Sequence, residues 1–125
     1  MKRLWPLFFP LLVWGQTPWM DYEEALSKAR AENKRVMVMA ESPDCPYCHT
    51  MTGSVLIDPA VSQRIEAHFI PVRMQRNDPA LPARVSMTPT FLFVDPHTRA
   101  VVKKIPGAWS VKDFCDLIDA AKKEP

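Results

Sequence analysis

Residues 42–49 read SPDCPYCH and come directly after the apolar run VMVMA at residues 36–40. That run is too short for a helix and is typical of a strand that is buried on both faces. The residues from Cys48 to about Val55 favour a helix. The sequence therefore places Cys45 and Cys48 at the junction between a buried strand and the first turn of a helix.

This junction is a favourable place for a reactive thiolate. The unpaired N–H groups and the positive dipole end of a helix stabilise negative sulfur and lower a cysteine pKa from about 8.5. The spacing lets the second thiol reach the first, so that a mixed disulfide is resolved within the chain. We expect Cys45, at the helix entrance, to be the exposed nucleophile and Cys48, one turn further, to be the buried resolving thiol.

The same residues allow two other interpretations. Cys45-x-x-Cys48-His49 is also the attachment pattern of a c-type haem, for which Met87 could supply a distal axial ligand. Two thiols and a methionine could instead hold copper in a chaperone. The preceding strand disfavours haem, because small c-type cytochromes are helical, and zinc would find only three ligands here. A redox dithiol is favoured, with the haem-binding electron carrier and the copper chaperone as alternatives.

On both sides of residues 42–49, helical and extended patterns alternate along the chain. We expect a helix over residues 21–32, and a second strand over 70–74 that follows a helix begun by Asp58 and Pro59. We also expect a loop with one helical turn over 76–84, a hairpin of 90–94 with 100–105, and a last helix capped by Ser110. This α-β-α-β-α-β-β-α order predicts an α/β domain with a mixed sheet.

Composition limits the function classes. The 125 residues include 47% hydrophobic and 24% charged side chains, which is the usage of one ordinary folded domain. A formal net charge of +2 argues against a nucleic-acid partner. Three cysteines are too few for a disulfide-stapled scaffold.

The first residues are typical of a secretory signal peptide. A positive start, MKR, precedes the apolar run LWPLFFPLLVW at residues 4–14, and Val13 and Gly15 suit a cleavage site. We therefore expect residues 1–15 to be a signal peptide, with a retained anchor as the alternative, and residues 16–125 to be one domain. The protein would then be periplasmic or secreted, and removal of Lys2 and Arg3 would leave equal numbers of basic and acidic side chains.

The chain resembles the thioredoxin superfamily. The resemblance rests on the strand, the CxxC at a helix start, and the stretch MTPTF at residues 87–91 that runs into a strand. It implies a thioredoxin fold with a mixed sheet of about four strands and a protein-disulfide oxidoreductase activity. It also implies that Pro89 is cis and faces the dithiol, and that the backbone of Thr88 pairs with a substrate peptide.

Several positions depart from the family's pattern and should tune the dithiol. Asp44 stands where thioredoxins usually carry tryptophan, and its charge opposes thiolate formation on Cys45. Pro46 and Tyr47 resemble the glutaredoxin insert, although the Gly-Gly pair with which glutaredoxins bind glutathione is missing. His49 could stabilise a thiolate by its charge.

Other departures concern the surroundings of the dithiol. Met39 occupies the position of the family's buried acid, and Glu41, with the same strand parity, could replace that acid. Tyr47 and Trp109 could form a hydrophobic rim for protein substrates. Cys115 lies on the apolar face of the last helix and is expected to be a buried core residue.

Together these features predict a thiol–disulfide oxidoreductase of exported proteins. The acidic neighbours of the dithiol favour the direction of a reductant. Its substrates would be exported proteins with cysteine pairs, and a membrane thiol carrier would supply the electrons. We expect a monomer that needs no metal or organic cofactor beyond the Cys45–Cys48 disulfide.

Overall fold

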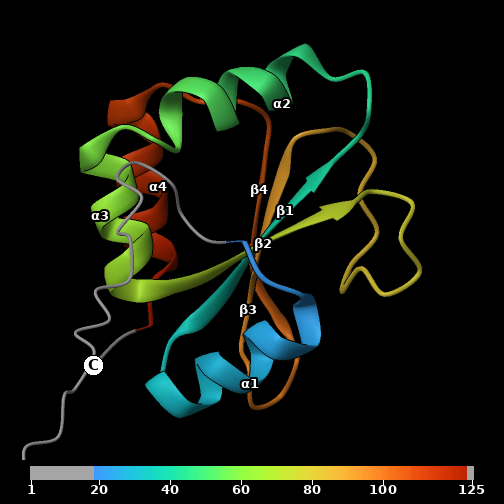
Figure 1. The fold of residues 1–125 in the computed structure, drawn as a ribbon, viewed down its shortest axis with the longest axis vertical. Helices are drawn as coiled ribbons and strands as arrows, with labels where there is room; N and C mark the ends of the chain where they lie inside the picture. Colours follow the sequence, from blue (N-terminus) through green and yellow to red (C-terminus); the bar gives the residue numbers. More distant parts are fainter. Residues whose placement is uncertain (1–18, 124–125) are drawn as a thin grey trace, which may run out of the picture.

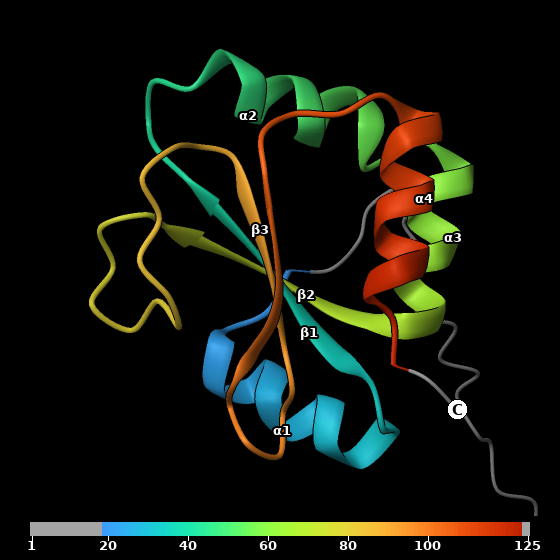
Figure 2. The same cartoon turned by 180° about the vertical axis from the view of Figure 1, so that it is seen from behind.

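Four strands form one mixed sheet in the order β2-β1-β3-β4 (Figures 1 and 2). The structure is a computed structural model and describes residues 19–123. β1 (Arg35–Glu41) runs parallel to β2 (Phe69–Gln75) and antiparallel to β3 (Thr90–Val94), which pairs antiparallel with β4 (Val101–Pro106). The expected mixed sheet of four strands is confirmed, whereas the expected signal peptide, residues 1–15, lies outside the described residues.

Helices cover both faces of this sheet. α1 (Tyr22–Glu32) packs on one face, and α3 (Pro59–His68) and α4 (Val111–Ala121) lie side by side on the other (Figure 1). α2 (Pro46–Thr50) and a single π-helical turn, η1 (Met51–Val55), lead from the end of β1 towards α3. This connection lets β2 run parallel to β1, because parallel neighbours need a crossover.

The helix starts follow their capping residues. The side chains of Asp21, Asp58 and Ser110 accept hydrogen bonds from backbone N–H groups in the first turns of α1, α3 and α4. These bonds satisfy N–H groups that lack a partner within the helix. Local sequence thus determines where each of the three long helices begins, as predicted.

The alternation of side chains in β1 divides the core into two clusters. Met37 and Met39 pack with the disulfide, α3 and α4, and Val36 and Val38 pack with α1. Residues two apart in a strand share a face. Glu41 therefore leaves the sheet on the same face as the two methionines, and this is the face that carries the cysteines.

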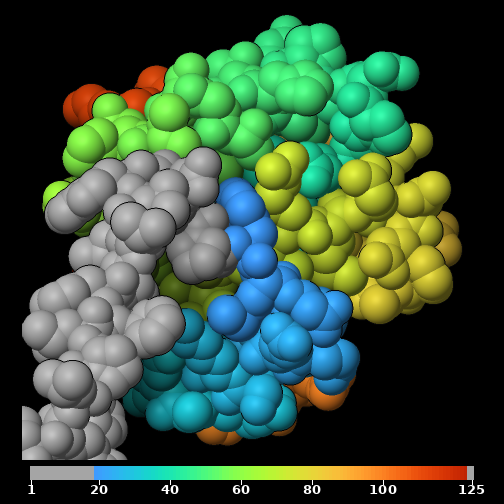
Figure 3. Space-filling view, in the orientation of Figure 1, coloured from blue at the N-terminus to red at the C-terminus, as the bar shows by residue number. Residues whose placement is uncertain are grey.

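Two details differ from the predicted elements. Residues 76–84 form a loop of turns at the surface (Figure 3), so the loop expected between the second and third strands is confirmed, whereas its helical turn is wrong. Pro79 and Pro82 each lack a backbone N–H, and Asp78 Oδ1 accepts from the N–H of Ala80 in a tight turn instead.

The helix expected to run to Val55 also changes its character at Met51. There the N–H of Leu56 donates to the carbonyl of Met51, which gives a π turn in place of α-helix. Within residues 19–123, no helix is both long and apolar enough to cross a membrane.

Candidate functional site

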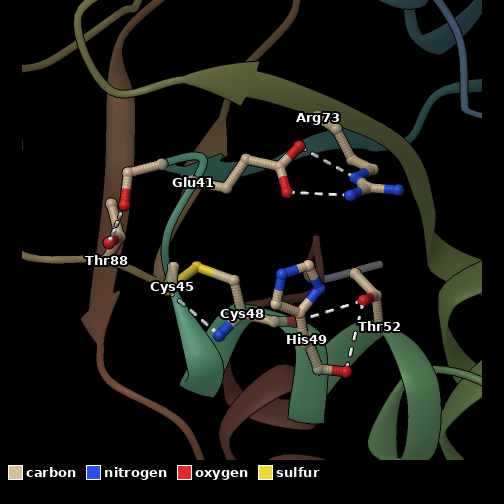
Figure 4. A network of polar contacts seen from close by, with 8 residues as sticks. Glu41, Cys45, Cys48, His49, Thr52, Arg73 and Thr88 are labelled. Atoms are coloured by element: carbon tan, nitrogen blue, oxygen red, sulfur yellow. Dashed lines mark hydrogen bonds and ion pairs between the residues drawn. A yellow bond between two sulfur atoms is a disulfide. The ribbon is translucent and has the colours of Figure 1, made fainter.

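Cys45 and Cys48 are joined by a disulfide at the start of α2 (Figure 4). Cys45 is the N-cap of this helix, and its Sγ accepts a hydrogen bond from the backbone N–H of Cys48 at 3.1 Å. The same N–H would face a thiolate on Cys45 once the disulfide is reduced, and a charge-assisted bond of this kind stabilises the anion. This hydrogen bond thus distinguishes the surroundings of Cys45 Sγ from those of Cys48 Sγ.

Exposure does not make this distinction. Cys45 is 5% exposed and Cys48 is 3% exposed, so the prediction of an exposed Cys45 is wrong for the oxidised chain. Both sulfurs belong to the core cluster that includes Met39 and Met51. The disulfide therefore lies within the core on this face of the sheet.

The loop before β3 lies at the same edge of the sheet as the disulfide. Ala40, near the end of β1, is in register with Thr90, the first residue of β3. The peptide bond between Thr88 and Pro89 is cis, and Pro89 is buried. The carbonyl of Pro89 accepts from the N–H of Gly107, which ties the loop to the chain after β4.

Glu41 does not stand alone beside the disulfide. Its two carboxylate oxygens accept hydrogen bonds from Arg73 on β2, at 2.8 Å from Nη2 and 3.0 Å from Nε (Figure 4). The Glu41 side chain is 14% exposed and that of Arg73 is 37% exposed. The guanidinium also lies over the Trp19 ring, 5.5 Å from its centroid. Glu41 is therefore one half of an ion pair, while Met39 is fully buried at the position of the family's acid.

Sequence reasoning missed Arg73. The sequence feature that could have indicated Arg73 is a single charged residue within FIPVRMQ, a strand of otherwise mostly apolar residues. In the parallel register Arg73 lies opposite Met39, two residues before Glu41 on the neighbouring strand. Only that register shows which carboxylate the guanidinium meets.

The other predicted tuning residues lie at the surface. Asp44, Pro46 and His49 are exposed, and Tyr47 is 67% exposed. In Figure 4 the His49 ring is drawn next to the disulfide. Within residues 19–123, no group of three or more His, Cys, Asp or Glu side chains is arranged to hold a metal ion.

Trp109 is 37% exposed and is held at two points. Its indole N–H donates to the carbonyl of Pro106, and its backbone N–H contacts Sδ of the buried Met51 at 3.4 Å. Met51 follows Cys48 by one helical turn. The Trp109 loop is thereby fixed to the helical segment that carries the cysteines.

The clear pKa shifts belong to groups far from the disulfide. Backbone N–H groups of His97 and Thr98 lower the pKa of Asp95 in the turn between β3 and β4. In the same region, the Arg99 guanidinium lowers the pKa of Glu23. These charges stabilise the opposite end of β3 and contribute nothing directly to the dithiol.

Residues 22–122 match the model of the thioredoxin-like domain family. The chain belongs to the thioredoxin-like family. A thioredoxin-like protein of known structure, the thioredoxin from Thermus thermophilus, is 36% identical with a TM-score of 0.71, over 82% of this chain and 84% of that one. The C-terminal domain of DsbD from Neisseria meningitidis, 19% identical, shares the fold with a TM-score of 0.64, over 83% of this chain and 98% of that one.

Anterior gradient protein 1 of Xenopus laevis is 30% identical over 88% of this chain, which spans 66% of that protein's length. The thioredoxin-like domain, its fold and the CxxC disulfide together make this chain a protein-disulfide oxidoreductase in general terms.

Proposed function

We propose that this chain reduces disulfides in exported proteins through the Cys45–Cys48 dithiol. The observation that carries the proposal is the hydrogen bond from the Cys48 N–H to the Cys45 sulfur at the start of α2. This bond supports Cys45 as the sulfur that becomes the stabilised thiolate after reduction. The reaction then needs no metal or organic cofactor.

The reaction proceeds in two exchanges. The Cys45 thiolate attacks one sulfur of a substrate disulfide, forms a mixed disulfide and releases the other substrate sulfur as a thiolate. The Cys48 thiolate then attacks Cys45 Sγ and releases the second substrate thiolate. The substrate has gained two electrons and, in water, two protons, and the enzyme holds the Cys45–Cys48 disulfide. A dithiol donor, which we propose is a membrane thiol carrier, returns the two electrons.

The surroundings of the dithiol favour a reductant. A strong oxidant of this class needs a strongly stabilised thiolate. Here Asp44 places a carboxylate next to Cys45 in the sequence, and Arg73 on β2 is already paired with Glu41. We propose that the helix start supplies the main stabilisation of the Cys45 thiolate, so that the reduced form is a good electron donor.

Recognition would rest on backbone and apolar contacts. We propose that a substrate peptide pairs with the backbone of Thr88 beside Pro89 and that Tyr47 and Trp109 flank it. Both aromatic side chains are exposed, and Met87, next to Thr88, is 49% exposed. Exposed apolar side chains around a reactive group suit unfolded or flexible protein segments with accessible cystines.

The proposed compartment follows from the sequence of residues 1–15. We propose that this segment directs export and is removed before Gln16, which leaves one monomeric domain in the periplasm or outside the cell. Mass spectrometry of the protein recovered from an export-competent host tests the cleavage. A mature chain that begins at Gln16 is expected, and a full-length chain in the cytosolic fraction would refute the export proposal.

Insulin reduction and a redox titration test the chemistry. We expect Cys45→Ser to abolish turnover and Cys48→Ser to accumulate a mixed disulfide that is visible on a non-reducing gel. Cys115→Ala is the matched control, because Cys115 is buried on α4 and outside the disulfide, and it should keep wild-type turnover. Retained turnover by Cys45→Ser would refute the nucleophile assignment.

The redox titration against a dithiol buffer decides the direction. We expect a reduction potential close to that of thioredoxins, which is about −270 mV. A potential near that of the strong oxidant DsbA, about −120 mV, would refute the reductant assignment and leave the oxidoreductase in place.

A further inference from the structure

We propose that Ser42 is a positioning residue that holds the Thr88–Pro89 loop in the conformation to which substrate peptides bind. This inference rests on the proposed function, because it concerns how the proposed peptide-binding edge is kept in place. It assigns a role to a side chain that neither carries a charge nor contacts the disulfide bond.

The hydroxyl groups of Ser42 and Thr88 form a hydrogen bond of 2.8 Å. Both residues are half-buried, and 46 positions of sequence separate them. Ser42 is the first residue after β1, and Thr88 lies two residues before β3 begins. The bond therefore joins the segment that leads to the cysteines with the loop that carries Pro89.

The bond lies where the backbone ladder between β1 and β3 ends. Ala40 and Thr90 are the last residues of these strands in antiparallel register. Continued outward, the same register brings Glu41 opposite Pro89, which has no N–H to donate. The carbonyl of Glu41 accepts from the N–H of Arg76 instead. The next pair in register is Ser42 and Thr88, where two side chains make the connection that the backbone does not.

This arrangement leaves the backbone of Thr88 available. In the part of the chain that the structure describes, no hydrogen bond involves the N–H or the carbonyl of Thr88. An extended peptide can therefore pair with the free backbone N–H and carbonyl of Thr88, while the Thr88 side chain stays hydrogen-bonded to Ser42. Loss of the anchor would add loop conformations that cannot bind, and apparent affinity falls in proportion to the competent fraction.

The predicted signature is a change in KM that depends on the substrate. One hydrogen bond of ordinary strength corresponds to roughly a fivefold change in an equilibrium constant. We therefore expect Ser42→Ala to raise KM for insulin by up to about fivefold with kcat unchanged. A small disulfide such as bis(2-hydroxyethyl) disulfide has no peptide backbone to pair with Thr88, so its kinetics should stay at the wild-type values.

Three further variants complete the experiment on the full chain. Thr88→Val removes the same bond from the other side and should give the same rise in KM, and the double variant should add nothing to either single change. Ser42→Thr keeps a hydroxyl and should restore the wild-type KM. Ser62→Ala, which changes a half-buried serine on α3, is the matched control and should leave both substrates unaffected.

The possible outcomes separate this inference from the proposed function. A wild-type chain that reduces neither substrate refutes the proposed function and the inference with it. An active wild type with an unchanged insulin KM in both Ser42→Ala and Thr88→Val overturns the inference and leaves the function standing. An equal rise in KM for insulin and for the small disulfide also overturns the inference, since it would place the effect at the sulfurs and not in the loop.

Discussion

Replacing Arg73 by methionine should destabilise the oxidised protein more than replacing Glu41 by methionine. Arg73→Met leaves a carboxylate that is only 14% exposed without its two donors, which costs about 2 kcal/mol. It also removes the guanidinium from the Trp19 ring, a contact that contributes about 0.5 to 1 kcal/mol. The expected loss in the free energy of unfolding is therefore about 2 to 3 kcal/mol.

The opposite change has a smaller effect because Arg73 is more accessible. Glu41→Met leaves a guanidinium whose side chain is 37% exposed and which still lies over Trp19. Water can replace the lost carboxylate, so we expect a cost of about 1 kcal/mol or less. The double variant has no unpaired charge and similar side-chain volume, and it should lie within about 1 kcal/mol of the wild type.

Urea unfolding of the oxidised chain, followed by circular dichroism at neutral pH, measures these differences. The double-mutant cycle should give a coupling of about 2 kcal/mol between the two side chains. Arg84→Met, at an exposed arginine in the loop after β2, is the matched control and should change stability by less than about 0.5 kcal/mol. Equal losses in the two single variants, or strictly additive losses in the double variant, would refute the reasoning.

The other predictions concern the turn, the core and the third cysteine. The pKa of Asp95 is lower in the folded than in the unfolded chain, so the ionised Asp95 stabilises the fold above about pH 4, and this contribution is lost as the pH falls through the folded pKa. Asp95→Asn should therefore lose less free energy of unfolding between pH 5 and pH 2 than the wild type does. An equal loss in the two proteins, measured by urea unfolding, would contradict this. Phe114 is fully buried with its ring centroid 4.8 Å from that of Phe91, so Phe114→Ala should lower the free energy of unfolding by about 3 to 5 kcal/mol, as measured by urea unfolding. At Cys115, which is 7% exposed, alanine should cost about 1 kcal/mol or less, and a cost above that of Phe114→Ala would show that the thiol is more than a small core residue.

Local patterns predicted most of the fold. The caps Asp58 and Ser110, the buried strand before the cysteines and the hairpin after Pro89 all depend on neighbours in sequence, and each was found where expected. Cys115 is buried on α4, as its place on an apolar helix face predicted. The prediction of a helical turn over residues 76–84 was wrong, because two prolines and an aspartate in this segment favour turns more strongly than its apolar residues favour a helix.

The contacts around the disulfide could not be predicted in the same way. Glu41 and Arg73 are 32 residues apart, and their pairing depends on the register between β1 and β2. The bond of Ser42 with Thr88 spans 46 residues. A single sequence shows the charges and hydroxyls but not which of them meet. The burial of Cys45 could likewise not be predicted from its position in the motif, because it depends on packing in the core cluster with Met39 and Met51.

The sheet order has a consequence for how copies of this protein meet at high concentration. β2 and β4 are the outer strands, and exposed outer strands can recruit other chains into aggregates. On β2, Pro71 lacks an N–H and its carbonyl accepts from the N–H of Met20, so that the chain before α1 covers part of this edge. On β4, Lys103 and Lys104 place positive charge along the other edge, and Lys104 Nζ donates to the carbonyl of Arg84. Both outer strands are thus protected against the addition of a strand from another chain. This is a useful property in an enzyme whose proposed substrates are partly unfolded chains.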